Sequence, residues 1–260
     1  MPEIWDCHLH VIGDRARWPL APDRGYEPPY APVEALLEHL DKMGADKGVL
    51  VQPSVYCFDN SCLLAALAAH PERLHGIVVP APSTRVEDFV RMHKLGVRGV
   101  RCNLVNTGGI TLDGTRPWWG WMQDHGWHIQ LQTHAGHADF LPPKNQLPPL
   151  KLVLDRLGFP PSGFTSQTMR PLLNAIDSGQ IHVKLSAPCR FSTLPAPHTD
   201  VQALARCCLE VGAHCLWASD WPHTDCTLPV IADRIWYEVV QDLAGDTFEQ
   251  MHSAAAALYQ

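Results

Sequence analysis

Short apolar segments alternate with amphipathic segments along most of the chain. Eight apolar runs are rich in Val, Ile or Leu and are bounded by Gly, Pro or polar residues, as expected for strands buried on both faces. We expect strands at 4–11, 48–53, 75–80, 97–103, 127–133, 150–155, 181–186 and 215–220. Between them, apolar residues recur at spacings of three and four, often ahead of a glycine, which predicts helices. These helices are expected at 33–43, 62–69, 86–95, 168–176, 201–211 and 231–243.

This alternation predicts an α/β protein with the fold of a (β/α)8 TIM barrel. A doubly wound open sheet is the alternative, but the chain has no Gly-x-Gly-x-x-Gly after the first strand and no Gly-Lys-Ser/Thr loop. Four prolines lie within 140–150, where the fifth helix is expected. Because proline removes a backbone donor and clashes inside helices, we expect a distorted barrel with a short or missing fifth helix. No repeat or linker divides the chain, so 1–260 is interpreted as one domain.

Composition narrows the class of partner. The 260 residues carry 20 Lys and Arg against 27 Asp and Glu, a formal net charge of −7. Such a chain offers no basic surface to nucleic acid or acidic lipid, and no stretch approaches the roughly 20 apolar residues of a membrane span. The N-terminus lacks the basic segment of a leader, and the nine cysteines form no Cys-x-x-Cys pair. We therefore expect a cytoplasmic protein with reduced cysteines that binds neither nucleic acid nor membranes.

Residues with catalytic chemistry follow the expected strands at their C-terminal ends, where barrel enzymes place active sites. His8 and His10 end the first strand and, because strand side chains alternate, point to one side. Two such imidazoles can hold one divalent metal or polarise a carbonyl oxygen. Asp220 ends the eighth strand, beside the first strand in a closed barrel, and can ligate that metal or act as a general base toward water. The alternative to a catalytic role is a structural one, in which His8 and His10 are buried and hydrogen-bonded and Asp220 caps a turn.

The remaining strand ends supply further polar side chains. They are Ser54, Arg101, Asn103, His134, Asp155, Arg156, Lys184, Ser186 and Arg190. Arginines at a barrel mouth can form forked hydrogen bonds to a carboxylate, which a lysine cannot. A surface ion pair is the alternative for each arginine.

Several segments together resemble the 2-pyrone-4,6-dicarboxylate lactonase branch of the amidohydrolase superfamily. They are WDCHLHV at 5–11, YEPP at 26–29, VQPSVY at 51–56, GVRCN at 99–103, VKLS at 183–186 and SDWPH at 219–223. The resemblance implies a small-molecule lactone or carboxylate substrate, with Asp220 activating water and His8 and His10 as an electrophilic or metal-binding pair. It also implies a pocket wall of Tyr26, Ser54, Arg101 and Arg190. Some members of the branch work without metal and others hold one zinc. The sequence is compatible with either a monomer or a homo-oligomer.

One departure from the family pattern lies at the end of the sixth strand. The family ordinarily has Asp-His-x-Gly there, whereas residues 155–158 of this chain read Asp-Arg-Leu-Gly. An arginine cannot bind a metal or accept a proton at ordinary pH. Arg156 can instead stabilise an oxyanion or hold a substrate carboxylate, so we expect it among the catalytic residues.

A second departure concerns the end of the fifth strand. His134 stands where other amidohydrolases place a metal ligand, so it can complete a divalent metal set with His8, His10 and Asp220, or contact substrate. Thr107 and Phe159 stand near positions where the pyrone-dicarboxylate members carry arginines. We therefore expect a substrate with at most one strongly held carboxylate.

The main expectation is hydrolysis of a lactone by Asp220-assisted attack of water. Lactone isomerisation is an alternative, in which a substrate hydroxyl attacks and no acid is released. Zinc-dependent decarboxylation is a third interpretation, motivated by His134. A non-hydrolytic binding barrel is the fourth, motivated by Arg156 and by the eroded fifth helix.

Overall fold

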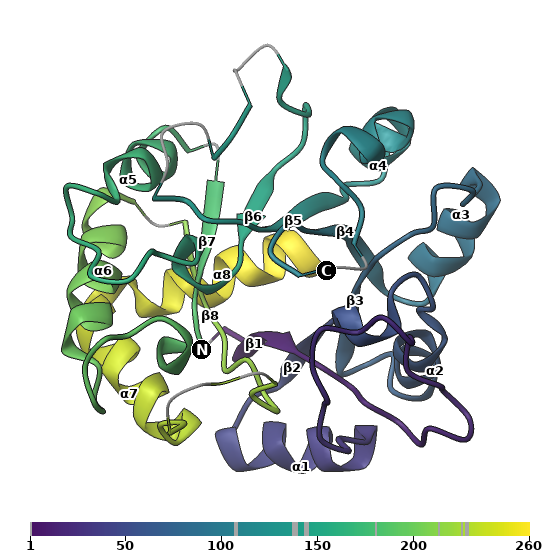
Figure 1. Ribbon diagram of the computed structural model, residues 1–260, viewed down its shortest axis with the longest axis horizontal. Helices are drawn as coiled ribbons and strands as arrows, with labels where there is room; N and C mark the ends of the chain where they lie inside the picture. Colours follow the sequence, from purple (N-terminus) through teal and green to yellow (C-terminus); the bar gives the residue numbers. More distant parts are fainter. Residues whose placement is uncertain are drawn as a thin grey trace.

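The computed structural model describes residues 2–106, 109–136, 140–142, 146–179, 181–212, 214–224, 226 and 229–260. Its centre is an eight-stranded parallel sheet in sequential order (Figure 1). The strands are β1 (Trp5–Leu9), β2 (Lys47–Val51), β3 (Leu74–Val78), β4 (Val97–Asn103), β5 (His128–Gln132), β6 (Leu152–Leu154), β7 (Ile181–Leu185) and β8 (Cys215–Trp217). The helices are α1 (Val33–Met43), α2 (Ser61–Ala69), α3 (Val86–Lys94), α4 (Trp119–Asp124), α5 (Arg170–Asp177), α6 (Thr199–Val211), α7 (Asp233–Ala244) and α8 (Phe248–Tyr259). The predicted (β/α)8 barrel is confirmed.

The expected gap in the helical ring lies between β5 and β6. The described residues of this connection, 133–136, 140–142 and 146–151, contain no α-helix. The prolines of this stretch remove the donors that a helix would need. The prediction of a short or missing fifth helix is therefore confirmed for the described part of the connection.

The sheet closes through the segment that follows β8. The His10 N–H donates to the Trp221 carbonyl at 2.9 Å, and the Asp220 N–H donates to the His8 carbonyl at 3.1 Å. β6 and β8 are shorter than the sequence predicts, so Asp155 and Asp220 lie just beyond the strand ends. Asp220 is thereby bonded through its backbone to β1, which carries His8 and directly precedes His10.

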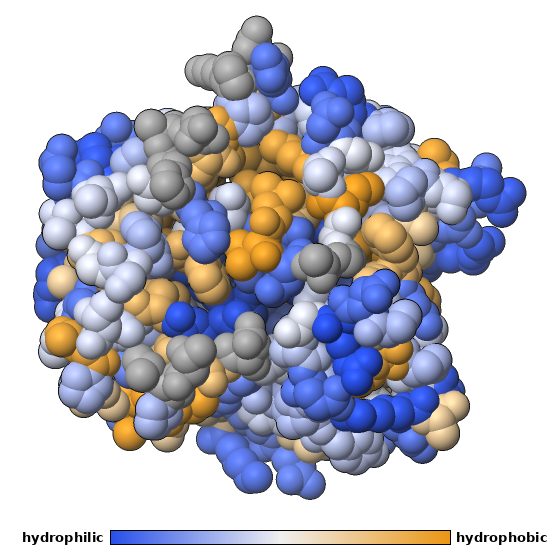
Figure 2. Space-filling model, in the orientation of Figure 1, coloured by the Kyte–Doolittle hydropathy of each residue, from blue (hydrophilic) through white to orange (hydrophobic). Residues whose placement is uncertain are grey.

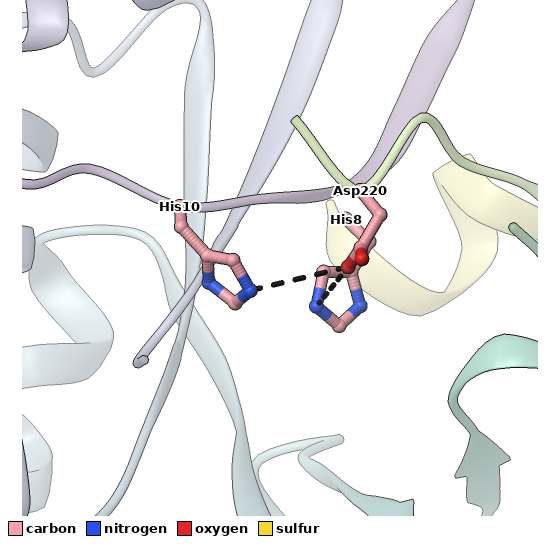
Figure 3. A group of neighbouring side chains, drawn as sticks. All are labelled: His8, His10 and Asp220. Atoms are coloured by element: carbon pink, nitrogen blue, oxygen red, sulfur yellow. Dashed lines mark ion pairs between the residues drawn. The ribbon is translucent and has the colours of Figure 1, made fainter. Parts of the chain in front are cut away.

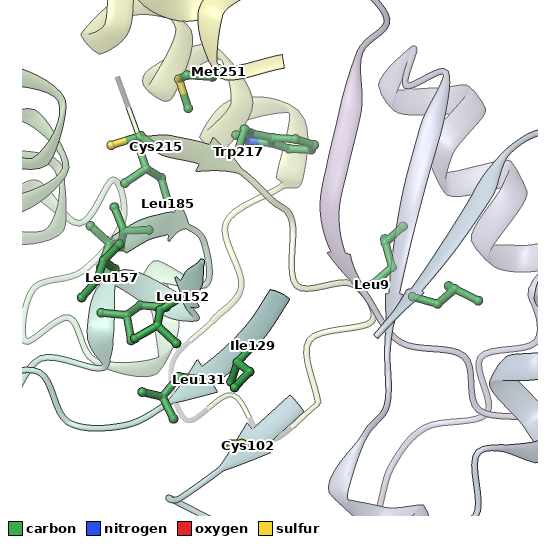
Figure 4. Close-up of a cluster of buried hydrophobic side chains, with 14 of the residues drawn as sticks. Leu9, Cys102, Ile129, Leu131, Leu152, Leu157, Leu185, Cys215, Trp217 and Met251 are labelled. Atoms are coloured by element: carbon green, nitrogen blue, oxygen red, sulfur yellow. The ribbon is translucent and has the colours of Figure 1, made fainter. Parts of the chain in front are cut away.

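Two apolar layers lie on opposite sides of the strands. The outer layer packs strand residues such as Ile129, Leu152 and Leu185 against the surrounding helices (Figure 4). The inner layer consists of Trp5, Cys7, Val49, Val51, Ile77, Val153, Leu216 and Ala218, together with Ala255, Leu258 and Tyr259 of α8. The space-filling view shows mostly polar residues around the edge of the molecule and a group of apolar residues near the middle of the same face (Figure 2).

Helix α8 is not among the helices expected from the sequence, although the spacing of its apolar residues indicates a helix. Phe248, Met251, Ala255 and Leu258 are buried at intervals of three and four residues. Tyr259 stacks on Trp5 at the start of β1, with ring centroids 5.9 Å apart. The helix therefore fills the N-terminal end of the barrel. Among the described residues, no helix is both long and apolar enough to cross a membrane.

Candidate active site

Three of the predicted residues meet at the C-terminal end of the barrel (Figure 3). His8 Nε2 lies 3.4 Å and His10 Nε2 lies 4.0 Å from Asp220 Oδ1. All three side chains are buried. One ligand atom from each residue lies within 4.8 Å of the others. This spacing suits a divalent metal, or a water molecule that contacts all three groups.

A register shift in β1 directs both histidines into the barrel. The pairing of β1 with β2 is irregular between Asp6 and Leu9. Cys7 belongs to the inner apolar layer, whereas Leu9 belongs to the outer one. Strict alternation from Cys7 would place His8 outside, so the irregularity turns His8 and His10 inward, as bulges beside active sites commonly do.

A hydrogen bond on the far side of the His10 ring determines which ring nitrogen carries the proton and which one faces Asp220. His10 Nδ1 lies 2.7 Å from the carbonyl oxygen of Val51. Because a carbonyl only accepts, Nδ1 carries the proton and Nε2 presents its lone pair toward Asp220. Burial and the neighbouring His8 hold the pKa of His10 well below its usual range, so the ring is neutral. Neutral His10 is therefore an acceptor at the centre and cannot donate to an oxyanion.

His8 is oriented in the same way. Its Nδ1 lies 3.1 Å from Asp155 Oδ1, with Lys184 Nζ further away at 3.5 Å. Burial lowers the pKa of His8 to about 4, although the Asp155 charge acts in the opposite direction. With the proton on Nδ1, the buried Nε2 faces Asp220 without a hydrogen-bond partner among the described residues. Two imidazole lone pairs and a carboxylate thus point to one place.

Arg156 makes the shortest contacts to Asp220. Its Nε donates to Oδ2 at 3.0 Å and its Nη2 donates to Oδ1 at 2.6 Å, which is a bidentate pair. Both residues are buried, and both have positive φ, 51° for Arg156 and 73° for Asp220, a conformation that few non-glycine residues adopt. Burial raises the pKa of the Asp220 carboxyl, but the charges of Arg156, His8 and Arg190 outweigh burial and lower it overall. Arg156 therefore faces the centre.

Gln132 links Arg156 to a second buried arginine. Its Oε1 accepts from Arg156 Nη1 at 2.9 Å and from Arg101 Nη2 at 2.6 Å. Sequence reasoning missed Gln132. The signal was the polar alternation of His128, Gln130 and Gln132 within an otherwise apolar strand, which marks a polar inner face.

Asp155 is the second carboxylate of the centre. Its Oδ1 lies near His8 Nδ1 and 3.7 Å from Lys184 Nζ, and its Oδ2 accepts from Arg101 Nη2 at 3.3 Å. Burial raises the pKa of this carboxyl, but His8 and Lys184 outweigh burial and hold it well below the usual range. Burial lowers the pKa of Lys184 to about 8, although Asp155 opposes this. Asp155 thus orients His8 and neutralises buried cations.

Two predicted pocket residues lie close to these arginines or to β2. Tyr26 is half-buried, and its hydroxyl is close enough to Arg101 and Arg156 to influence the pKa of each guanidinium. Ser54 is buried in a single helical turn directly after β2. That these two residues form a wall of the centre stays a prediction.

The other two predicted residues line a neighbouring cavity. Arg190 and His134 border an open cavity of about 480 Å³ together with Phe159 and Phe191. Arg190 Nη1 donates to the Thr224 carbonyl at 2.6 Å. His134 is exposed, its Nδ1 lies 3.2 Å from the Phe159 carbonyl oxygen, and it is not one of the ligands grouped around Asp220. The expected metal set that includes His134 is therefore not formed, because the residue turns toward this cavity.

Comparison with known proteins places the chain in a family. A family model described as Amidohydrolase matches residues 5–249. The chain belongs to the amidohydrolase family. A 4-sulfomuconolactone hydrolase of Rhizobium radiobacter is 30% identical over 229 residues, which cover 85% of this chain and 76% of that protein.

Two further relatives carry different names. A D-galactarolactone isomerase of Agrobacterium fabrum is 25% identical over 188 residues, which cover 70% of this chain and 63% of that protein. A solved structure from Pseudomonas putida, assigned as a 2-pyrone-4,6-dicarboxylic acid hydrolase, is 30% identical with a TM-score of 0.83 and covers 100% of this chain and 98% of its own.

Amidohydrolases are often metal-dependent, and His8, His10 and Asp220 offer the nitrogen and oxygen ligands that zinc prefers. In this amidohydrolase, however, both oxygens of Asp220 already accept hydrogen bonds from Arg156. The ligand set is spaced for a metal, but its carboxylate is engaged by a guanidinium. The residues present therefore fit a resident metal poorly.

Proposed function

We propose that this amidohydrolase hydrolyses a lactone at the C-terminal end of its barrel. The observation that carries the proposal is the meeting of two buried acceptors with a buried guanidinium. Asp220 Oδ1 and His10 Nε2 lie 4.0 Å apart, and Arg156 contacts the same carboxylate. Hydrolysis of an ester needs a base that takes a proton from water and donors that stabilise the oxyanion. This centre brings both to one point.

The two acceptors suit a nucleophilic water. A water between them donates one hydrogen to Asp220 and the other to His10, whose Nε2 carries no proton. Its lone pairs then face outward toward a carbonyl carbon. As the oxygen–carbon bond forms, Asp220 takes the proton, and when the ring ester bond breaks, this proton passes to the leaving oxygen. The products are the opened hydroxy acid and an ionised Asp220.

Arg156 supplies the positive charge in this scheme. A guanidinium has five N–H donors, and Asp220 and Gln132 take three of those of Arg156. One donor on Nη1 and one on Nη2 remain for a carbonyl oxygen. A carboxylate paired with a guanidinium is a weak base. Negative charge leaves Asp220 as it develops on the carbonyl oxygen, however, so Arg156 stays beside the charge throughout the reaction.

The named relatives agree with this chemistry, because the Rhizobium radiobacter protein is a lactone hydrolase by name. The isomerase relative favours a second candidate, in which a substrate hydroxyl occupies the position of the water. The same base then produces a new ring without net acid release. Decarboxylation loses its motivation, because His134 lies apart from the centre.

Acid release tests the proposal directly. A pH indicator follows the parent protein on sugar lactones, muconolactones and pyrone carboxylates, beside Asp220→Asn and the exposed control Asp113→Asn. We expect acid release from at least one lactone, with the rate lowered about 10²- to 10⁴-fold in Asp220→Asn and unchanged in the control. An Asp220→Asn protein as active as the parent would contradict the proposal. Ring rearrangement without acid would favour the isomerase.

A further inference from the structure

The buried centre contains a ligand set and a cation that compete for one carboxylate. His8 and His10 each present an unprotonated Nε2, because each Nδ1 is directed at an acceptor on its far side. Asp220 would be the third ligand. Its Oδ1 and Oδ2 are both engaged by Arg156. We propose that Arg156 keeps divalent metal ions out of this centre by holding its positive charge against Asp220, the anionic ligand of the set.

The loop that follows β6 holds Arg156 in the centre. Its side chain is 2% exposed, and Nη1 is held by Gln132 at 2.9 Å. Its backbone begins a run of four residues with positive φ that ends at Phe159. The Gly158 carbonyl accepts from the Ala135 N–H at 2.7 Å, and a Cβ at Gly158 would lie 2.5 Å from Ala135 Cβ. The loop is therefore packed tightly against the end of β5, and it holds the guanidinium in the centre.

The buried charges act in the same direction. Arg101, Arg156 and Lys184 are buried cations that pair with Asp155 and Asp220, whereas the third buried carboxylate, Asp6, accepts from the backbone N–H groups of His8 and Ser219. A divalent ion held by Asp220 would lie beside the Arg156 guanidinium, whose nitrogens are 3.0 Å or less from the two Asp220 oxygens. Positive charges placed so close together in a site that excludes solvent repel one another strongly. Removal of the Arg156 charge lowers this cost and also frees the carboxylate.

Zinc binding tests this inference without any substrate, so the result is independent of the proposed hydrolysis. The parent protein, Arg156→Met, Arg156→His and the control Arg101→Met are dialysed against micromolar zinc, and bound zinc is counted by atomic emission. Arg101 is the matched control because it is a buried guanidinium on the same Gln132, but it pairs with Asp155 instead of Asp220. Thermal unfolding with and without zinc reports whether each variant is folded.

We expect no stoichiometric zinc in the parent or in Arg101→Met. Arg156→Met should bind about one zinc per chain through three ligands, and Arg156→His should bind at least as tightly because it adds a nitrogen. Zinc should raise the unfolding temperature of these two variants alone. One zinc bound tightly by the parent would overturn the inference even if no variant folds. Folded Arg156 variants without zinc would also overturn it. Equal binding by Arg101→Met would show that the total buried positive charge, and not the pairing of Arg156 with Asp220, excludes the metal, and would overturn the inference as well.

Discussion

The interior of the barrel has two halves of opposite character. The inward positions of β8, β1, β2 and β3 are mostly apolar below His8 and His10: Leu216, Trp5, Cys7, Val49, Val51 and Ile77, with His75, which packs against Trp5, as a polar exception. The inward positions of β4 to β7 are mostly polar: Arg101, His128, Gln130, Gln132, Asp155 and Lys184, with Val153 as an apolar exception. Helix α8 contacts both halves, since Tyr259 stacks on Trp5 and meets His128 edge-on.

The two halves obey different energetics. Apolar side chains are stabilised by burial alone, so their contribution does not depend on partners or on protonation. Buried polar groups stabilise the fold only when each has its partner, because an unpaired buried charge is costly. In the polar half, Lys184 Nζ donates to Gln130 Oε1 at 2.6 Å, and Arg101 donates to Gln132 and Asp155. The polar half is therefore the part of the barrel most vulnerable to a single substitution.

Removal of one charge from the polar half should have the largest effect. Asp155→Asn leaves Lys184 and Arg101 without their shared carboxylate, and should lower the free energy of unfolding by about 3–5 kcal/mol at pH 7. The pKa of Asp155 lies well below its usual value, so its stabilisation is present above pH ~4 and is lost as the pH falls through the folded-state pKa. Urea unfolding at several pH values measures both effects. The exposed Asp124→Asn is the control, and a loss below about 1 kcal/mol in Asp155→Asn would show that the cations find other partners.

A cavity in the apolar half should have a smaller effect that is independent of pH. Ile77→Ala removes a fully buried side chain from the inner layer and should cost about 3 kcal/mol. Because no charge is involved, the loss should be equal at pH 5 and pH 7 and at low and high salt. Urea unfolding measures it against Ile235→Ala, which truncates a half-exposed isoleucine of α7. A clear salt dependence in Ile77→Ala would mean that the two halves are coupled.

The apolar half and the strand order could be predicted from sequence, because strands buried on both faces are continuous apolar runs. Segment 97–103 is strand in both the prediction and the structure. Helix α1 is likewise confirmed at both ends, since Gly44 adopts the left-handed conformation that ends it. These are local signals, which a single segment of chain contains in full.

The groups at the C-terminal end of the barrel could be predicted only in part. The sequence places Arg156 and Asp220 at strand ends, but their pairing depends on side-chain directions 64 residues apart. The His8 side chain points inward because of an irregularity in the pairing of β1 with β2, and no residue in this segment predicts that irregularity. His134 also follows a strand, yet its ring contacts the Phe159 carbonyl oxygen in the loop after β6. Strand position predicts that such residues are near the mouth, and only the fold determines which of them meet.

The smallest expected effect concerns His128, at the end of the polar half remote from Asp220. His128 is 1% exposed, and neither ring nitrogen has a hydrogen-bond partner among the described residues. Burial and the Lys184 charge lower its pKa to about 3. Below pH ~6.5 the unfolded chain therefore binds a proton that the folded protein rejects, and the parent should lose about 2 kcal/mol at this site by pH 5.

His128→Phe removes this proton while keeping a ring against Tyr259. Its free energy of unfolding should match that of the parent at pH 7 and exceed it by up to about 2 kcal/mol at pH 5. Urea unfolding at both pH values measures the difference, with the exposed His125→Phe as the control that should leave the pH dependence unchanged. Identical pH dependence in the parent and in His128→Phe would mean that the folded protein does protonate His128. In that case a protonated histidine would be tolerated at the N-terminal end of the strands in the polar half. The energetic contrast between the two halves would then depend only on the ion pairs that Asp155 forms with Arg101 and Lys184.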